Sequence, residues 1–375
     1  MKTKFVILTL LTVLALGCDN DKGIVIDLNK RDSISIAEFI DHIDVIQLET
    51  TSQSLLNSIS QAIFYNECYY VFDSRQQAVL SFHKTGEFRY KIHSVGRGPG
   101  EYSYLGHFNI DIYNNRLMLL EPFGSILYYD LDGKFIEKVT LPSDCKAYNE
   151  VYAINKDTLL FVSLNEFYFV YYSSADNRII KRIFPIDQDG SSMSPTGRMY
   201  QYKDTIYLNT VLSKNEIYNM SSDSVSVDYV WDFGKSNYKN EEIKSLYNDI
   251  AELRANYKQV RINDFVGNGK QLSHFISISV ETNRYRIAEV MVENDFILVF
   301  YDKKEKYYYV LNKTIEGIQP LFRDITNESI VLWDYGSYEY KYYDMSVLNE
   351  GQIEIINNHN KETDNPFLVV YHLKQ

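Results

Sequence analysis

The sequence predicts an all-β protein, specifically a six-bladed β-propeller with one inserted amphipathic helix. Three observations predict this architecture. Aromatic and polar residues alternate in short runs, a unit of strands and turns recurs along the chain, and a single stretch with helical periodicity interrupts the series.

The strands are predicted from composition and period. The chain holds 33 Tyr and 20 Phe, but only 17 Gly and 7 Pro. Aromatic residues favour strands, and alternation with polar residues indicates one buried face. The runs that show this pattern are Tyr69–Asp73, Arg116–Leu120, Leu159–Ser163, Thr205–Asn209, Phe296–Tyr301 and Ser329–Trp333.

The recurring unit predicts the blades. In the first clear copy, Asn66 and Glu67 lead into CYYVFD, AVLSFH, a polar turn and FRYKI; about 48 residues later, Asn114 and Asn115 lead into RLMLLE, SILYYD, a second polar turn and FIEKV. A period of 40 to 50 residues with three or four strands is typical of a propeller blade. Further turns at 155–157, 203–204, 293–295 and 327–328 continue the series, so we expect about six blades.

The two ends of the chain are expected to meet in one blade. A ring whose first and last blades are not joined would expose strand edges that promote aggregation. We therefore expect a strand around Asp44–Leu48 to pair with a strand around Phe367–His372.

A helix is predicted between residues 238 and 260. Apolar residues recur there at helical spacing, with Glu, Lys and Asn between them. The simpler interpretation places its apolar stripe on the propeller, and the alternative is a helix that binds a partner.

The N-terminus has the pattern of an export signal. Lys2 and Lys4 precede the apolar run Phe5–Leu16, which is too short to span a bilayer and matches the core of a secretory signal. Cys18 follows the small residue Gly17, as in a lipobox, where the thiol is lipidated and becomes the new N-terminus. The sequence therefore predicts a lipid anchor on Cys18 and attachment to a membrane.

Two neighbouring features bear on this prediction. Ala15 and Leu16 depart from the usual lipobox, which leaves open an ordinary signal peptide with an incidental cysteine. The acidic tract Asp19–Asp21 resembles the surface-export signal of Bacteroidetes lipoproteins and favours the outer membrane, on its periplasmic or cell-surface face. We expect a signal and lipobox over 1–18, a tether and first strand region over 19–40, and the propeller over 41–375.

Charge and cysteine content restrict the partners. The net charge of −12 and the absence of a run rich in Lys and Arg argue against binding nucleic acid. Cys68 and Cys145 remain besides Cys18, and a disulfide between them is permitted in an oxidising compartment, although two thiols cannot hold together a domain of this size.

Three strings carry a family resemblance. IDVIQLETTSQSLLNSI (43–59), VGRGPGEY (95–102) and NPFLVVYHLK (365–374) resemble the six-bladed β-propeller lipoproteins of Bacteroidetes, which are similar to NHL-repeat propellers. The resemblance implies the fold and an envelope location. It implies no chemistry, because the function of that family is largely unknown.

Motifs for chemistry are absent from the sequence. There is no GxSxG, HExxH, CxxC or GxxxxGK, and the seven His residues show no metal-ligand spacing. Asp130–Gly133 opens like a calcium loop, but a hairpin turn explains it better. Gly96–Gly100 has the spacing of a phosphate cradle without the helix that such a cradle needs. No metal, cofactor or catalytic set is therefore predicted.

The loop from Gly96 to Tyr102 is the candidate ligand-binding site. Its closely spaced glycines and Pro99 indicate one unusual backbone path. This path suits a tight crossover between blades, with Arg97 and Glu101 paired with each other or with neighbouring strands. It also suits a site at the channel mouth, where Arg97, Glu101 and Tyr102 offer a guanidinium, an acceptor and a stacking face to a ligand.

Two classes of function remain open. The first, which we favour because no metal set is visible, is a binding or scaffold propeller that holds a glycan, peptide or protein partner. The second is a propeller enzyme, similar to a lactonase or lyase, with its active site at the mouth of the channel.

Overall fold

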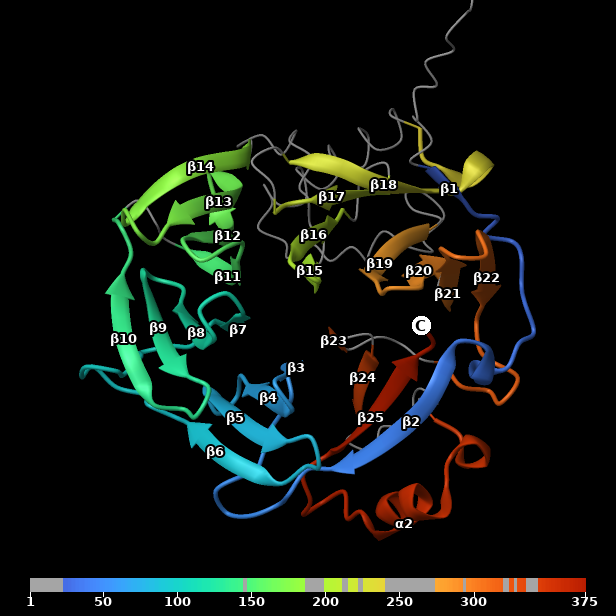
Figure 1. Ribbon diagram of the computed structural model, residues 1–375, viewed down its shortest axis with the longest axis horizontal. Coiled ribbons are helices and arrows are strands. Elements are labelled where there is room, and N and C mark those ends of the chain that lie inside the picture. The colour runs from blue at the N-terminus through green and yellow to red at the C-terminus, as the bar shows by residue number, and fades with distance from the viewer. Residues whose placement is uncertain are drawn as a thin grey trace, which may run out of the picture.

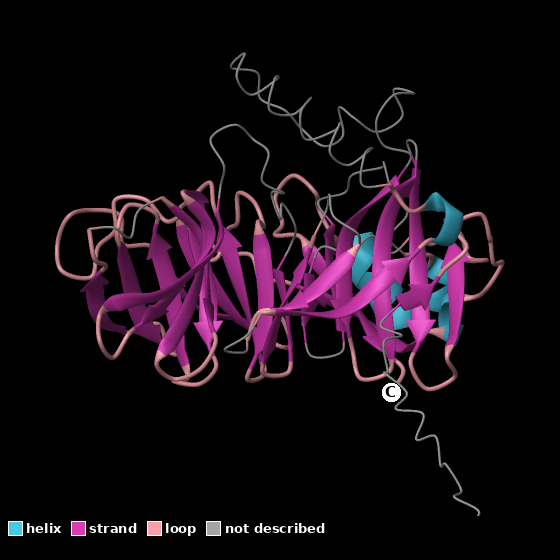
Figure 2. Cartoon of the chain, turned by 90° about the horizontal axis from the view of Figure 1, so that it is seen from above, coloured by secondary structure: helices cyan, strands magenta, loops and turns pink. Residues whose placement is uncertain are grey.

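The computed structural model describes residues 23–143, 147–185, 199–210, 215–221, 225–239, 274–292, 295–319, 324–326, 329–334 and 343–375. Within these ranges the chain forms six sheets arranged in a ring, each with four antiparallel strands (Figure 1). Seen edge-on, the strands make one layer with turns at both faces (Figure 2). The protein is a six-bladed β-propeller, as the sequence predicts.

The blades are numbered from the N-terminal side. Each has four strands in a meander, given in order from the innermost strand of the ring to the outermost. Their bounds are as follows: blade 1, β3 (Gln61–Tyr65), β4 (Cys68–Asp73), β5 (Ala78–His83) and β6 (Phe88–Ile92); blade 2, β7 (His107–Asp111), β8 (Arg116–Glu121), β9 (Ser125–Asp130) and β10 (Phe135–Thr140); blade 3, β11 (Tyr148–Ala153), β12 (Thr158–Asn165), β13 (Phe167–Ser173) and β14 (Arg178–Pro185).

The second half of the ring follows the same plan with additions from the N-terminus. Its bounds are as follows: blade 4, β15 (Met199–Tyr202), β16 (Thr205–Asn209), β17 (Glu216–Asn219) and β18 (Ser226–Asp232), with β1 (Gly23–Val25) as a fifth strand; blade 5, β19 (His274–Glu281), β20 (Tyr285–Val292), β21 (Asp295–Asp302) and β22 (Tyr307–Leu311); blade 6, β23 (Asp324–Thr326), β24 (Ser329–Asp334), β25 (Phe367–Leu373) and β2 (Ile40–Gln47). All six predicted aromatic runs lie in strands, namely β4, β8, β12, β16, β21 and β24.

Local sequence explains the tight turns. Asn66 and Glu67 both have positive φ angles, 49° and 63°, which is the geometry of a two-residue turn whose twist matches the paired strands. At the end of β9, Asp130 Oδ1 accepts the backbone N–H groups of Asp132 and Lys134, and Gly133 has a φ of 79°. The Asp130–Gly133 segment is therefore the hairpin turn that its sequence predicts.

The core lies between the blades. The described residues form six clusters of buried side chains, one for each pair of neighbouring blades. Between blades 6 and 1, for example, Val370 packs in one cluster with Leu80. Each sheet therefore buries both faces, and the ring is held by sheet-to-sheet packing around its whole circumference.

The ring closes where the two ends of the chain pair. β2 runs antiparallel to β25 from Ile40, opposite Leu373, to Gln47, opposite Phe367. The predicted pairing is confirmed, because Asp44 lies opposite Val370.

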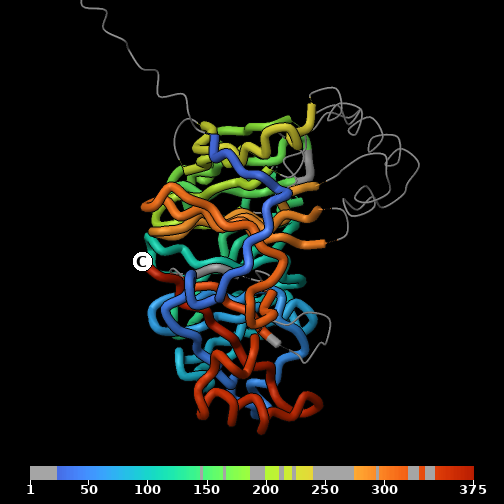
Figure 3. Tube along the Cα trace, turned by 90° about the vertical axis from the view of Figure 1, so that its right-hand side faces the viewer, coloured from blue at the N-terminus to red at the C-terminus, as the bar shows by residue number. Residues whose placement is uncertain are grey.

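The segment before β2 packs against the ring. β1 pairs in parallel with β18, and Ile24, Ile26 and Leu28 are buried in the cluster between blades 4 and 5. The chain then passes blade 5 (Figure 3). There the Asp32 N–H donates to the Val310 carbonyl at 2.7 Å, before the chain forms the short 3-10 helix η1 (Ile36–Glu38). From residue 23 onwards this segment is therefore part of the domain.

The described residues contain one α-helix, α2 (Glu350–Asn358), and two further 3-10 turns, η2 (Gly234–Ser236) and η4 (Met345–Val347). Asn349 and Gln352 form a capping box at the start of α2. The sequence interpretation did not include α2. The helix predicted over 238–260 lies, apart from Tyr238 and Lys239, outside the described residues, as do Cys18 and Cys145.

One turn differs from the expectation. Residues 293, 294, 327 and 328 lie outside the described residues, and Asp295 is the first residue of β21, the third strand of blade 5. The turn of blade 5 equivalent to Asn66–Glu67 is 282–284. The segments 282–284 and 293–295 are both polar and contain an Asn, so composition does not distinguish them.

No helix among the described residues is long and apolar enough to cross a membrane.

Candidate functional site

The turns between the first and second strands of blades 1 to 5 form a connected rim. We call residues 65–67, 113–115, 154–157, 202–204 and 282–284 the first-turn rim. Hydrogen bonds join neighbouring turns: Tyr65 hydroxyl to Asn115 Oδ1 at 3.2 Å, Asn114 Nδ2 to the Lys156 carbonyl at 3.0 Å, and Tyr202 hydroxyl to Asn283 Oδ1 at 2.9 Å. Because these bonds run from blade to blade, they hold the turns at one face of the ring.

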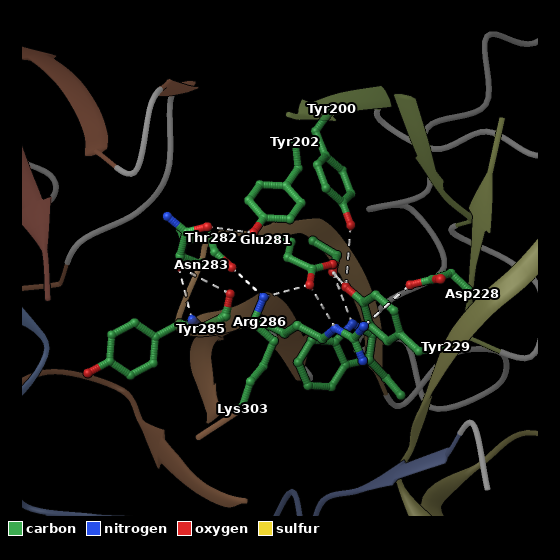
Figure 4. A network of polar contacts seen from close by, with 12 residues as sticks. Tyr200, Tyr202, Asp228, Tyr229, Glu281, Thr282, Asn283, Tyr285, Arg286 and Lys303 are labelled. Atoms are coloured by element: carbon green, nitrogen blue, oxygen red, sulfur yellow. Dashed lines mark hydrogen bonds and ion pairs between the residues drawn. The ribbon is translucent and has the colours of Figure 1, made fainter. Parts of the chain in front are cut away.

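A charged network lies beneath this rim between blades 4 and 5 (Figure 4). Glu281 ends β19 and is 7% exposed, and its cross-strand partner on β20 is Arg286. Glu281 Oε1 lies 2.8 Å from Lys303 Nζ and 3.3 Å from Arg286 Nε, the second contact being an ion pair without hydrogen-bond geometry. Arg286 Nη2 also lies 3.4 Å from Oδ2 of Asp228, on β18 of blade 4. The network therefore joins the two blades.

Tyrosines surround the two cations. The Arg286 guanidinium lies over the Tyr229 ring, 3.9 Å from its centroid, and Lys303 Nζ lies 5.1 Å from the centroid of Tyr202. The Tyr229 hydroxyl is 3.4 Å from that of Tyr200. Cations over ring faces are attracted by the negative face of the π-system.

Two atoms of the network, Arg286 Nε and Glu281 Oε2, make no hydrogen bond to another described residue. Glu281 Oε2 is buried and accepts no hydrogen bond, although both cations face Oε1 of the same carboxylate. A buried carboxylate oxygen ordinarily accepts at least one hydrogen bond. This oxygen is therefore a spare acceptor for an N–H or O–H group.

The electrostatics keep the network neutral as a whole. Burial raises the pKa of Tyr200 well above its usual range, so its hydroxyl stays protonated and able to donate. Burial by itself would lower the pKa of Arg286, but Glu281, Tyr229 and Asp228 outweigh this effect and raise it. The formal charges of Arg286 and Lys303 balance those of the two carboxylates.

The predicted loop lies at the other end of the blades, between β6 and β7. Val95 and Tyr102 form an isolated bridge across it. Tyr102 is fully buried between blades 1 and 2, and its hydroxyl donates to the Gln77 carbonyl at 2.5 Å. The loop is a blade-to-blade crossover, and Tyr102 belongs to the core rather than to the surface.

The two charged residues of the loop are not paired with each other. Glu101 Oε2 accepts the Gly98 N–H at 2.6 Å and so closes the loop on itself. Arg97 is exposed, and no hydrogen bond or ion pair joins it to another described residue. Ligand binding by Arg97, Glu101 and Tyr102 stays a prediction.

Sequence interpretation missed the Glu281 network. A usable signal was present, because Glu281 and Arg286 have the same spacing across a first turn as Asp111 and Arg116 in blade 2. An alignment of the repeats that included the turn at 282–284 would have placed the two pairs together.

The comparisons with known proteins identify the family. The model of DUF4934, a domain of unknown function, matches residues 23–372. The chain belongs to this family. A search of curated protein sequences found no match. The narrower likeness of the chain to NHL-repeat propellers stays a prediction.

Among solved structures, a Bacteroides fragilis protein described as exported is similar over 94% of this chain and 100% of its own, with 18% identity and a TM-score of 0.72. A member of the DUF4221 family from Bacteroides vulgatus covers 89% of this chain and 97% of its own, with 9% identity and a TM-score of 0.49. At 18% identity, the likeness to the Bacteroides fragilis protein shows the fold alone.

Proposed function

We propose that this DUF4934 propeller is a non-enzymatic binding module of the cell envelope. Its ligand binds at the first-turn rim between blades 4 and 5, beside Tyr202 and Lys303. The observation that carries the proposal is the spare acceptor Glu281 Oε2, on a carboxylate beneath that rim whose other oxygen, Oε1, faces two cations.

The chemistry of the site favours an uncharged ligand with several hydrogen-bond donors, such as a glycan. The charges of the network balance within it, so an ionic ligand would meet no net opposite charge. Tyr202 is only partly buried at the rim and offers an apolar face, while the carboxylate beneath accepts hydroxyl or amide protons. Lys303 links the two positions, because its Nζ lies 5.1 Å from the centroid of the Tyr202 ring and 2.8 Å from Glu281 Oε1.

Binding is tested on an array of neutral and acidic oligosaccharides, with the Glu281→Gln and Tyr202→Ala variants. Each has a matched control: Asp111→Asn changes the equivalent carboxylate in blade 2, and Tyr65→Ala changes the equivalent rim tyrosine in blade 1. We expect capture of a neutral glycan by the wild type and by both controls, with a loss of at least tenfold in the two test variants.

Other results would overturn the proposal. Equal loss in Tyr65→Ala and Tyr202→Ala would show that the rim acts only structurally. Chemical turnover of a captured sugar, abolished by Glu281→Gln, would support the enzyme of the lactonase or lyase kind.

The location is the second part of the proposal. We propose that the protein is held at the outer membrane by a lipid on Cys18. The lipobox-like sequence supports this, together with the export described for the Bacteroides fragilis protein of similar fold.

The anchor is tested by replacing the thiol. Cys18→Ala is expected to move the protein from the membrane to the soluble fraction and to abolish incorporation of a fatty-acid probe. Continued labelling of the variant, or continued sedimentation with membranes, would contradict lipidation at this residue.

A further inference from the structure

Three metal-binding side chains meet where the ring closes. His42 and Asp44 lie on β2, and His372 lies on β25 directly opposite His42 in the register. One ligand atom from each lies within 4.8 Å of the other two, and this is the one such group of His, Cys or acidic side chains that the described residues contain. The three residues come from opposite ends of the chain.

The ring nitrogens are oriented by other partners. Nδ1 of His42 lies 2.9 Å from Asp41 Oδ2, and Nδ1 of His372 lies 3.0 Å from the Ser329 hydroxyl. Because Nδ1 of each imidazole has a neighbour that can accept its proton, Nε2 is left to bind elsewhere. Histidines that bind metals usually have such a second partner on the ring nitrogen facing away from the ion.

Both Nε2 atoms lie near one carboxylate oxygen. Asp44 Oδ2 is 2.9 Å from His372 Nε2 and 4.0 Å from His42 Nε2. In a tetrahedral zinc site with bonds of about 2.0–2.2 Å, ligand atoms lie about 3.3–3.6 Å apart. The two distances fall on either side of that spacing, so small side-chain rotations would bring both Nε2 atoms to ligand spacing from Asp44 Oδ2.

An ion can reach the group from solvent. The side chains of His42, Asp44 and His372 are 54%, 48% and 31% exposed. The two imidazole rings stack with centroids 4.0 Å apart and planes 11° from parallel, so the rings tilt when their in-plane Nε2 lone pairs converge on one ion. Two imidazoles and one carboxylate are a donor set that suits Zn²⁺ and related divalent ions.

We propose that the β2–β25 seam binds one divalent transition-metal ion, such as Zn²⁺, through His42 Nε2, His372 Nε2 and Asp44 Oδ2. A fourth position remains open to water. Because the ligands belong to the strands that close the ring, the bound ion links the N-terminal and C-terminal segments and stabilises the closed propeller. The site was not predicted from the sequence, and it is independent of the Glu281 network.

The test uses purified protein without a polyhistidine tag. We expect titration calorimetry with Zn²⁺ to show one site per chain, and Co²⁺ to give the absorption spectrum of a low-coordinate site. His42→Ala and Asp44→Asn, both at exposed positions of the outermost strand, should each weaken Zn²⁺ binding by at least 100-fold. His93→Ala, an exposed histidine outside the group, is the matched control and should leave binding unchanged.

A further variant separates this geometry from adventitious binding. Asp41→Asn leaves all three ligands in place but weakens the acceptor at His42 Nδ1, and should reduce affinity by about 10- to 100-fold. Zn²⁺ should also raise the melting temperature of the wild type by a few degrees, and not that of His42→Ala. Equal binding by the wild type and His42→Ala, or no binding by the wild type at micromolar Zn²⁺, would overturn the proposal.

Discussion

Blades 2 and 5 carry the same kind of ion pair at the same place. In blade 2, Asp111 ends the first strand and faces Arg116 across the turn, and in blade 5, Glu281 faces Arg286 in the same register. Each arginine also lies over a tyrosine, at 3.6 Å from the ring centroid in blade 2 and 3.9 Å in blade 5. The two carboxylates nevertheless have different partners.

In blade 2 the carboxylate is saturated by its own turn. Asp111 Oδ1 accepts the Asn114 N–H at 3.1 Å, and Oδ2 accepts Asn114 Nδ2 at 2.8 Å and Arg116 Nε at 3.0 Å. In blade 5 the Thr282 hydroxyl takes over this role by accepting the Tyr285 N–H at 2.9 Å. Glu281 therefore does not accept a hydrogen bond from the Tyr285 N–H of its turn, and its Oε2 makes no hydrogen bond to another described residue. A carboxylate that holds its own turn is structural, whereas one that does not is available to a ligand.

The first strands of blades 2 and 5 both begin with a histidine. Among the differences between these two blades, the response to acid should be the largest. Burial lowers the pKa of His274 to about 4. Burial also lowers the pKa of His107, but there Glu150 opposes the lowering. A folded-state pKa below the unfolded value means that the unfolded chain binds the proton more readily. Stability is therefore lost as the pH falls from about 6.5 to about 4, by on the order of 3 kcal/mol for His274.

Urea unfolding between pH 7 and pH 4 measures this effect. The His274→Gln variant should lose much of the pH dependence, and His107→Gln should lose less. Identical slopes for the wild type and His274→Gln would show that blade 5 does not hold a neutral buried histidine.

The ion pairs themselves are compared by isosteric substitution. Asp111→Asn puts an amide N–H₂ against groups that donate, so we expect a loss of about 2–3 kcal/mol in the free energy of unfolding. In Glu281→Gln the amide nitrogen can occupy the position of Oε2, which faces no donor, and the loss should be about 1 kcal/mol. Equal losses in chemical denaturation would remove the distinction between the two blades.

The crossover loop between β6 and β7 also holds a residue with a structural role beside an exposed one, and the expected effects on stability are smaller. Tyr102→Phe removes the hydrogen bond to the Gln77 carbonyl and should lower stability by about 1 kcal/mol. Arg97→Ala, at an exposed side chain, should change it by less than about 0.5 kcal/mol. Loss of glycan capture by Arg97→Ala at unchanged melting temperature would establish the loop as a second binding surface, whereas no change in either would remove it as a site.

Secondary structure and closure were predictable because they depend on local pattern. Alternating aromatic residues make the run 69–73 a strand wherever it lies, and Asn66–Glu67 suits a tight turn by its own conformational preference. The pairing of β2 with β25 follows from the need to cover strand edges. The addition of β1 to blade 4 was not predictable, because a three-residue strand has no periodicity.

The sequence by itself determined a ring of aromatic strands, the number of blades and the segments that close the ring, because strand and turn preferences act between near neighbours. Only the tertiary structure decided the chemistry. Whether Glu281 keeps a free oxygen depends on which group satisfies its turn and on Asp228 from the next blade. The meeting of His42 with His372 likewise depends on the register of two strands from opposite ends of the chain. The contacts with Asp228 and with His372 are set by packing across long sequence separations, which leaves no local pattern to read.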